Sequence, residues 1–230
     1  SRVTLEMKNA LSRGQLASYP SGYHYQTIKA LAALASDVAE ARIYSSFERA
    51  AWAAGVHAGQ NLTVPDIADP AFPEPCSGGL CYWRPFLDMD QVDCPVLLPI
   101  LPVSCPPAPA ALLFRERPKP EVPQSDICSP VSLSAMKRGV YDLIEHTDPA
   151  RKGAVEIMKG WGDFDIFKYW SRKGPYLSLL IDENRFEALF NELLSRSILI
   201  SPFFPGPSII PNDYSSGDFG KLKNLLSIGV

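Results

Sequence analysis

Two adjacent hydroxyl side chains, Ser45 and Ser46, stand directly before a segment of helical character, "FERAAWAAGVHAG" at 47–59. Serine in this position can cap a helix, and the free N–H groups at a helix start favour a bound anion. Arg42 and Arg49 flank the pair and add positive charge. The spacing therefore indicates a site for phosphate or another small anion, and a plain helix cap is the alternative.

A second group of residues with chemical potential surrounds His24 in the segment "SYPSGYHYQ" at 18–26. Its phenols and hydroxyls could line a pocket for a small ligand, with Tyr23 and His24 as contacts. The alternative is a tyrosine-rich loop packed at an interface. His57, in a helix of small residues, is interpreted as structural, and His146 at a helix end is explained by the helix dipole. The residues of the candidate ligand site are Arg42, Ser45, Ser46, Tyr23 and His24.

The cysteines follow no recognisable metal or disulfide pattern. The odd count of five in a chain of 230 residues argues against a disulfide framework. The first four are separated by 5, 13 and 11 residues, so the paired C-x2-C of zinc sites is missing. Ordinary, partly buried thiols are therefore expected at Cys76, Cys81, Cys94, Cys105 and Cys128.

Composition excludes several classes of partner. The 46% apolar content is enough for one large domain or two small ones. A net charge of -3 gives no general attraction to nucleic acid or anionic lipid. The apolar run "PVLLPILPV" (95–103) falls short of the about 20 residues that cross a bilayer. Charged residues near the start stand where a signal peptide would be apolar. A cytoplasmic protein without nucleic-acid or membrane partners is expected.

The hydrophobic periods predict an alternation of helices and strands. Helices are predicted at 3–16, 26–41, 47–59, 129–146, 148–170 (in two pieces), 183–197 and 216–229. Strands are predicted at 42–46, 81–87, 94–101, 109–117, 175–182 and 198–201. Residues 60–130 are rich in proline but still apolar, which favours packed extended chain over disorder. Within them, "RERPKPEVPQSD" (115–126) is predicted to be an exposed polar linker.

The order of elements near the C-terminus is similar to that of a known family. A strand "PYLSLLID", a helix "RFEALFNELLSRS" and a strand "ILISPFF" lead through a proline-rich loop to a helix opened by Asp218. This order resembles the C-terminal small domain of fold-type I pyridoxal-phosphate (PLP) enzymes, the aminotransferase superfamily. The helix at 129–146 looks like the long helix that links the two domains of those enzymes.

The front of the chain carries a second part of the resemblance. "ASYPSGYHYQTIKALAALA" and "RIYSSFERAAWAAG", together 17–55, look similar to the first helices and strand of the family. Ser45 and Ser46 stand where the family has a Ser-Gly turn whose helix N-terminus holds the cofactor phosphate. The resemblance thus implies the same kind of anion site as the local spacing does.

The resemblance implies an α/β, aminotransferase-like fold in two parts. Residues 1–128 would be a reduced remnant of the large domain with a proline-rich extended middle. Residues 129–230 would be the C-terminal α/β small domain. Since the family usually dimerises, a homodimer is expected.

The chain departs from the family at the residues that carry PLP chemistry. There, a lysine forms the Schiff base, a strand-end aspartate pairs with the pyridine nitrogen, and an arginine near the C-terminus binds a substrate carboxylate. Lys119 falls near the lysine's place in chain order but stands between two prolines. "PSIIP" (207–211) occupies the arginine's place, and the aspartates of "LDMDQVD" (87–93) identify no pyridinium partner.

Together these features predict an aminotransferase-like protein that has lost PLP catalysis and acts as a small-molecule-binding or interaction module. No cofactor is then expected. The alternative is a PLP-dependent transferase with a rearranged active site that acts on an amino-group substrate, with PLP as its cofactor. A credible Schiff-base lysine would distinguish the two.

Overall fold

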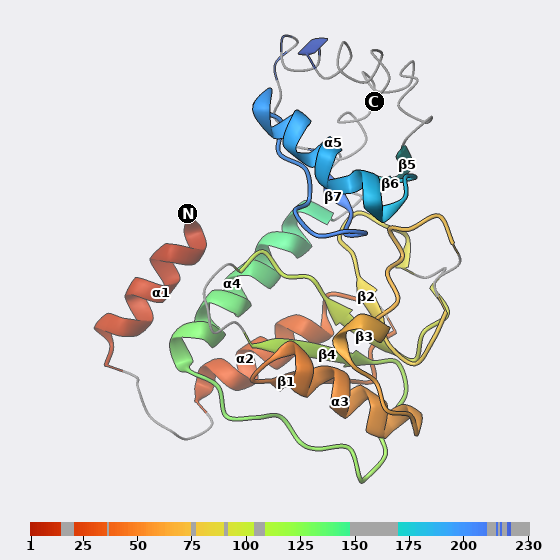
Figure 1. The fold of residues 1–230 in the computed structure, drawn as a ribbon. Helices are drawn as coiled ribbons and strands as arrows, with labels where there is room; N and C mark the ends of the chain where they lie inside the picture. The colour runs from red at the N-terminus through yellow and green to blue at the C-terminus, as the bar shows by residue number, and fades with distance from the viewer. Residues whose placement is uncertain are drawn as a thin grey trace. The chain divides into compact units, whose positions relative to one another are not determined.

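The computed structural model of the chain describes residues 1–14, 21–35, 37–74, 77–89, 92–103, 109–147, 170–210, 215, 217 and 220–221. The chain divides into two compact units (Figure 1). The first unit comprises Ser1–Pro70 and Cys76–Arg151, and the second comprises Ala71–Pro75 and Lys152–Val230. The helix predicted at 129–146 packs within the first unit, and a domain boundary at 128/129 stays a prediction.

The first unit is built on a four-stranded sheet with the order β1-β4-β3-β2. Its strands are β1 Glu40–Tyr44, β2 Cys81–Trp83, β3 Val96–Pro99 and β4 Ala110–Phe114. Strand β4 runs antiparallel to both β1 and β3, and β2 runs parallel to β3. Every residue of β3 and β4 is buried, which explains their unbroken apolar sequences. The strands predicted in these four places are confirmed. Strands β2, β3 and β4 are shorter than predicted, and β1 begins and ends earlier than the predicted 42–46.

Helices cover both faces of this sheet. The α-helices among the described residues of this unit are α1 Arg2–Ser12, α2 Gly22–Ala32, α3 Phe47–Ala58 and α4 Pro130–Thr147. Because side chains alternate along a strand, Ile43 and Leu113 face the core formed with α2 and α4, and Tyr44 and Phe114 face the alanines of α3. Helix α1 packs alongside α4 (Figure 1). The result is a layered α/β unit with two cores.

Helix α2 is the main difference from the predicted helices of this unit. It spans Gly22–Ala32, whereas 26–41 was predicted. Leu34, Ala35 and Val38 continue the apolar period, but they pack against the α2–α4 core from the connection to β1. The apolar period therefore predicted correctly which residues are buried, but it predicted too long a helix. Residues of the loop after α2 can fill the α2–α4 core as helical residues would.

The connection between β4 and α4 lies along the free edge of β1. We call residues 115–129 the strap. The N–H of Ile43 donates to Ser125 Oγ at 3.1 Å, and the N–H of Asp126 donates to the carbonyl of Ile43 at 2.8 Å. Val122 is buried in the α3 core. The prediction of a wholly exposed linker is therefore wrong, and the strap protects an edge strand that would otherwise present unpaired backbone groups.

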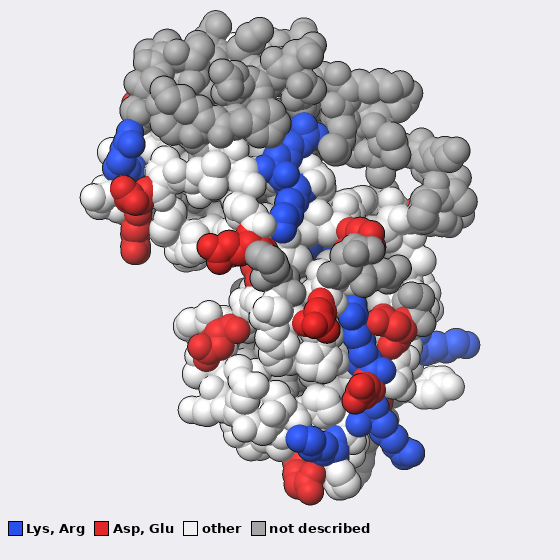
Figure 2. Space-filling view, turned by 90° about the vertical axis from the view of Figure 1, so that its right-hand side faces the viewer, with Lys and Arg blue, Asp and Glu red and all other residues white. Residues whose placement is uncertain are grey.

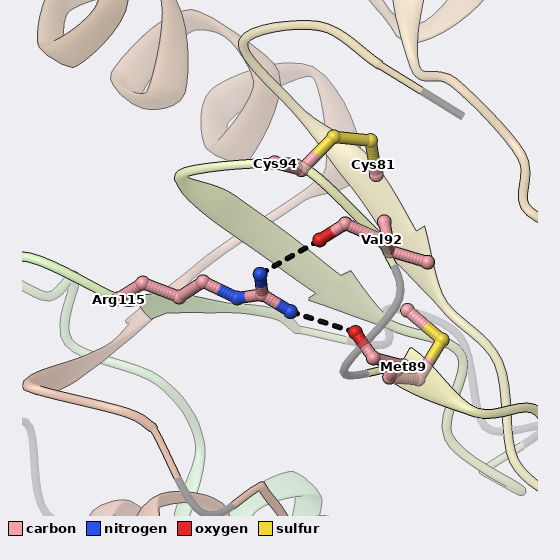
Figure 3. The surroundings of a disulfide bond; sticks show 5 residues. All are labelled: Cys81, Met89, Val92, Cys94 and Arg115. Atoms are coloured by element: carbon pink, nitrogen blue, oxygen red, sulfur yellow. Dashed lines mark hydrogen bonds between the residues drawn. A yellow bond between two sulfur atoms is a disulfide. The ribbon is translucent and has the colours of Figure 1, made fainter. Parts of the chain in front are cut away.

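A disulfide joins Cys81, at the start of β2, to Cys94, just before β3 (Figure 3). Arg115 lies beside it and donates to the carbonyls of Met89 at 2.8 Å and Val92 at 2.7 Å. The prediction of ordinary thiols is therefore wrong for these two cysteines. The Cα atoms of the two cysteines lie 6.0 Å apart, a proximity that the sequence spacing alone does not reveal.

Of the other three cysteines, the structure describes one. Cys128 is a free thiol of intermediate burial, as predicted. Cys76 and Cys105 lie outside the described residues. Among the residues that the structure describes, no group of three or more histidine, cysteine or acidic side chains is arranged to hold a metal ion.

The second unit contains an antiparallel sheet with the order β5-β6-β7 and one described long helix. Its elements are β5 Trp170–Lys173, β6 Tyr176–Leu179, α5 Glu183–Ser195 and β7 Ser208–Ile209. Trp170, Leu189 and Leu193 form its core together with two isoleucines. The predicted strand over 175–182 and the predicted helix over 183–197 are confirmed in β6 and α5.

Two other predictions for this unit fail in part. Residues 198–201 form no strand, and β7 at 208–209 pairs with β6 instead. Prolines follow directly after 201, and the N–H of Ser201 donates to Ser208 Oγ, so the two segments meet without a ladder. Trp170 lies in a strand, while the rest of the helix predicted at 148–170 lies outside the described residues, as does most of the one at 216–229.

The surface and the helices give two further observations. On the face in Figure 2, Lys and Arg side chains are interspersed with Asp and Glu, and neither sign dominates. Among the described helices, none combines the length and the apolar character that a membrane crossing requires.

His57 on α3 is a buried titratable residue. Its ring packs edge-on against Phe114, with the centroids 5.3 Å apart, and its Nδ1 has no hydrogen-bond partner. Burial and the charge of Lys119 lower its pKa, Glu116 opposes this, and Arg42 adds to the lowering. The packing agrees with the structural role predicted for this histidine.

Replacing His57 with glutamine should remove part of the stability loss on acidification. The unfolded imidazole titrates near 6.5 and the folded one lower, so the unfolded state binds more protons between the two values. The neutral histidine's contribution is therefore full above about pH 6.5 and is lost as the pH falls towards the folded pKa. Urea unfolding from about pH 7.5 to about pH 5 measures the effect. Equal pH dependence in both proteins would contradict it.

Candidate functional site

The start of α3 already holds a negatively charged group from the same chain. The N–H and the Oγ of Ser45 donate to Oδ2 of Asp126 at 2.9 and 2.8 Å. Nε of Arg49 lies 3.5 Å from Oδ1 of the same carboxylate. Ser46 caps the helix, since its Oγ accepts the N–H of Arg49 at 3.2 Å. The predicted helix and cap are thus confirmed, and the Ser45 donors are engaged by a carboxylate.

Asp126 is ionised at neutral pH. Desolvation raises its pKa, but the hydrogen bonds from the Ser45 amide and hydroxyl, together with the charge of Arg49, outweigh desolvation and leave the pKa lowered. The position at a helix N-terminus favours the same charge state. An ionised carboxylate therefore lies beside Arg49 where the resemblance places a cofactor phosphate.

Arg42, assigned to the candidate site from the sequence, binds carbonyl groups of the strap instead. Its Nη1 donates to the carbonyls of Val122 at 2.7 Å and Pro123 at 2.9 Å, and its Nε pairs with Glu40 at 2.7 Å. The Arg42 side chain is 6% exposed. The hydroxyl of Tyr44 also donates to Pro123, at 2.8 Å. These contacts hold the strap on β1, so Arg42 anchors the strap and does not face the donors at Ser45.

Tyr23 and His24 lie in the first turn of α2 and have different surroundings. Tyr23 is buried, its hydroxyl accepts from Nη1 of Arg13 at 3.1 Å, and Nζ of Lys137 lies 5.1 Å from its ring centre. His24 is partly buried, and desolvation lowers its pKa. Tyr23 thus contacts the α1 and α4 region, and only His24 reaches the candidate site.

His24 and Asp126 line one small pocket in the first unit. Its walls come from the start of α2, the end of the strap and the first turn of α4; the lining residues are Ser21, His24, Ser125, Asp126, Ile127, Cys128 and Leu133. The pocket volume is about 60 Å³. The structure therefore brings two of the predicted residues together through Asp126: His24 lines the pocket, and Ser45 holds its carboxylate.

Several residues of this pocket were not identified from the sequence. Ser21 precedes α2, but its hydroxyl makes no cap hydrogen bond, and its Oγ is buried without a partner. Burial, then the charge of Asp126, raises the pKa of the Cys128 thiol to about 11. Asp126 stands 81 positions from Ser45. The local signal available was an acidic residue just before a predicted helix, and nothing in it pointed to β1.

No family model matches the sequence. An uncharacterized protein of Treponema pallidum (strain Nichols) is 36% identical over 61 residues. That match covers 26% of this chain and 17% of the relative, so the chain matches less than a fifth of that protein's length.

Solved structures give a longer match. A serine palmitoyltransferase from S. paucimobilis with bound PLP has a TM-score of 0.62 and 9% identity, covering 99% of this chain and 83% of that one. An omega-transaminase from Sphaerobacter thermophilus has a TM-score of 0.58 and 10% identity, covering 98% and 82%. A transaminase with PLP bound has a TM-score of 0.58 and 14% identity, covering 98% and 81%.

The chain has an aminotransferase-like α/β fold. At these identities the likeness establishes the fold alone, and the fold class predicted from the sequence is confirmed. Because structures with this fold contain PLP, the comparisons do not support the expectation that this chain has no cofactor.

Proposed function

We propose that this PLP-transferase-related protein has lost PLP catalysis and binds a small molecule at the pocket of His24 and Asp126. One observation carries the proposal: the Asp126 carboxylate holds both donors of Ser45 at the start of α3. In the resembled family that position belongs to the cofactor phosphate.

The negative charge of Asp126, in the position that it occupies at the start of α3, would repel a phosphate there. Two like charges 4 Å apart repel by about 4 kcal/mol near a protein surface. The donors of Ser45 are also already used, so a phosphate would gain them only after Asp126 had moved away. Arg49 offsets part of the charge, but its side chain is 40% exposed and water screens it.

The size and lining of the pocket do not fit PLP either. Pockets for drug-sized ligands have about 300–1,000 Å³, whereas this pocket has about 60 Å³. Its lining contains no lysine. Lys119 is exposed on the strap, and Nζ of Lys137 donates to Oε1 of Gln26 at 3.2 Å. Neither lysine lines the pocket.

Incubation with PLP followed by borohydride should leave no lysine stoichiometrically modified. The measurement is peptide mapping by mass spectrometry of the full chain, with Lys119→Gln and Lys137→Gln as controls for surface labelling. Scattered labelling at low yield agrees with the proposal. Complete labelling of a single lysine, lost when that residue is changed, would contradict it.

The alternative is a PLP-dependent transferase with a rearranged active site that acts on an amino-group substrate. The PLP-bound structures among the fold neighbours favour it. It requires Asp126 to leave Ser45, so that these donors could hold the cofactor phosphate, and a lysine within reach of the cofactor's aldehyde carbon. The same mapping experiment separates the two, because only the alternative gives one modified lysine.

The remaining sequence predictions belong to the same proposal. The mixed charges in Figure 2 suit a role without nucleic acid. A homodimer, an interaction role and a cytoplasmic location are proposed from composition and from the resemblance. Sedimentation of the purified chain tests the homodimer, and a monomer at all concentrations would contradict it.

A further inference from the structure

We propose that the pocket beside Asp126 binds a small organic cation, with an ammonium or guanidinium group, and excludes small anions. The inference rests on the small-molecule binding proposed above and reverses the sign of the ligand that the serines at the start of α3 suggested.

The lining carries one charge at neutral pH, and it is negative. Of the seven lining residues, three can ionise: His24, Asp126 and Cys128. Desolvation lowers the pKa of His24, which favours the neutral imidazole, and the Cys128 thiol has a pKa of about 11 and stays protonated. The carboxylate of Asp126 therefore sets the sign of the pocket.

The pocket also offers hydrogen-bond acceptors that the chain does not use fully. Oδ2 of Asp126 takes both bonds from Ser45, while Oδ1 faces Arg49 only at 3.5 Å. A carboxylate oxygen can accept more than one hydrogen bond, so Oδ1 keeps acceptor capacity beside this long contact. The Oγ of Ser21 is buried without any partner. A cation with several N–H groups would supply a donor to the unpartnered Ser21 Oγ and a further donor to Oδ1 beside Arg49.

The volume limits the ligand to a few heavy atoms. A cavity needs about 10–15 Å³ to hold one water molecule, so a pocket of about 60 Å³ has room for a few groups of that size. Methylammonium and guanidinium fit this size, and a sugar phosphate does not. Ile127 and Leu133 in the lining provide apolar contact for a methyl group.

Titration of the ¹⁵N-labelled full chain with methylammonium chloride tests the inference, with sodium chloride as the salt control. Saturable shifts are expected at the amides of Ser21, His24 and Cys128. Asp126→Asn should weaken binding about tenfold or more, because a charged hydrogen bond is lost. Glu121→Gln removes an exposed charge from the same strap outside the pocket and should leave the affinity unchanged. Equal binding by Asp126→Asn and the unchanged chain would overturn the inference.

A second variant controls for the case in which Asp126→Asn displaces the strap from β1 and so changes the pocket indirectly. Ser21→Ala leaves the bonds between Ser45 and Asp126 in place, which an unchanged Ser45 amide signal verifies, and it should also weaken methylammonium binding. A parallel titration with sodium phosphate separates the two proposals. Phosphate binding without methylammonium binding overturns the cation and leaves small-molecule binding intact. Binding of neither probe counts against both.

Discussion

Replacing Cys81 and Cys94 together with alanine should lower the free energy of unfolding by about 3 kcal/mol. The two cysteines are 13 positions apart, and closing a loop of about this length restricts the unfolded chain by that amount. Both side chains are buried, so the loss is felt in the core that they share with Leu97. Urea unfolding of the oxidised chain and of the double variant measures the difference.

The free cysteine provides the matched control for this prediction. Cys128→Ala removes a partly buried thiol without opening a disulfide and should cost much less. Thiol counting under denaturing, non-reducing conditions checks the pairing itself. Titration of Cys81 and Cys94 as free thiols, or equal stability of the double variant and the unchanged chain, would show that the disulfide is not formed.

Arg42→Met should lower the free energy of unfolding by about 3 kcal/mol or more. The substitution keeps the length and apolar stem of the side chain. It leaves the buried carbonyl of Val122 without its donor, leaves that of Pro123 with the Tyr44 hydroxyl as its remaining donor, and removes the partner of Glu40. Hydrogen exchange of the strap amides should rise together with the loss in stability, because the same contacts hold the strap on β1.

Arg49→Met is the control, since Arg49 is 40% exposed and touches the strap only through its 3.5 Å contact with Asp126. Its cost should stay below about 1 kcal/mol, as for other exposed ion pairs. If Arg42 were an anion ligand and not an anchor, Arg42→Met would leave stability nearly unchanged and would weaken phosphate binding. Equal stability of the two variants would therefore reject the anchoring role.

Local features of this fold could be predicted from the sequence. Helix α3 follows a serine pair, and the cap by Ser46 forms as the residue types indicate. Strands β3 and β4 are unbroken apolar runs that suit burial on both faces of a sheet. These predictions depend only on neighbouring residues, so one sequence is sufficient for them.

The contacts that define the candidate site could not be predicted in this way. Asp126 reaches Ser45 across 81 positions because the strap runs along β1, and no periodicity encodes that register. Arg42 was predicted as an anion ligand from its residue type alone, because it is a cation near two serines. The sheet instead directs its guanidinium to the strap carbonyls of Val122 and Pro123. Tertiary pairing therefore decides which of the chemically suitable residues meet.

Titration of the Asp126 carboxyl carbon by NMR tests most directly the central claim, that this carboxylate holds the donors at the start of α3. A midpoint below the ordinary value of 3.8 is predicted, because Ser45 donates to the ionised form. The stability that this bonding gives is present above the unfolded pKa and is lost as the pH falls through the folded pKa. Ser45→Ala should raise the midpoint. A midpoint at or above the ordinary value that Ser45→Ala leaves unchanged would contradict the account.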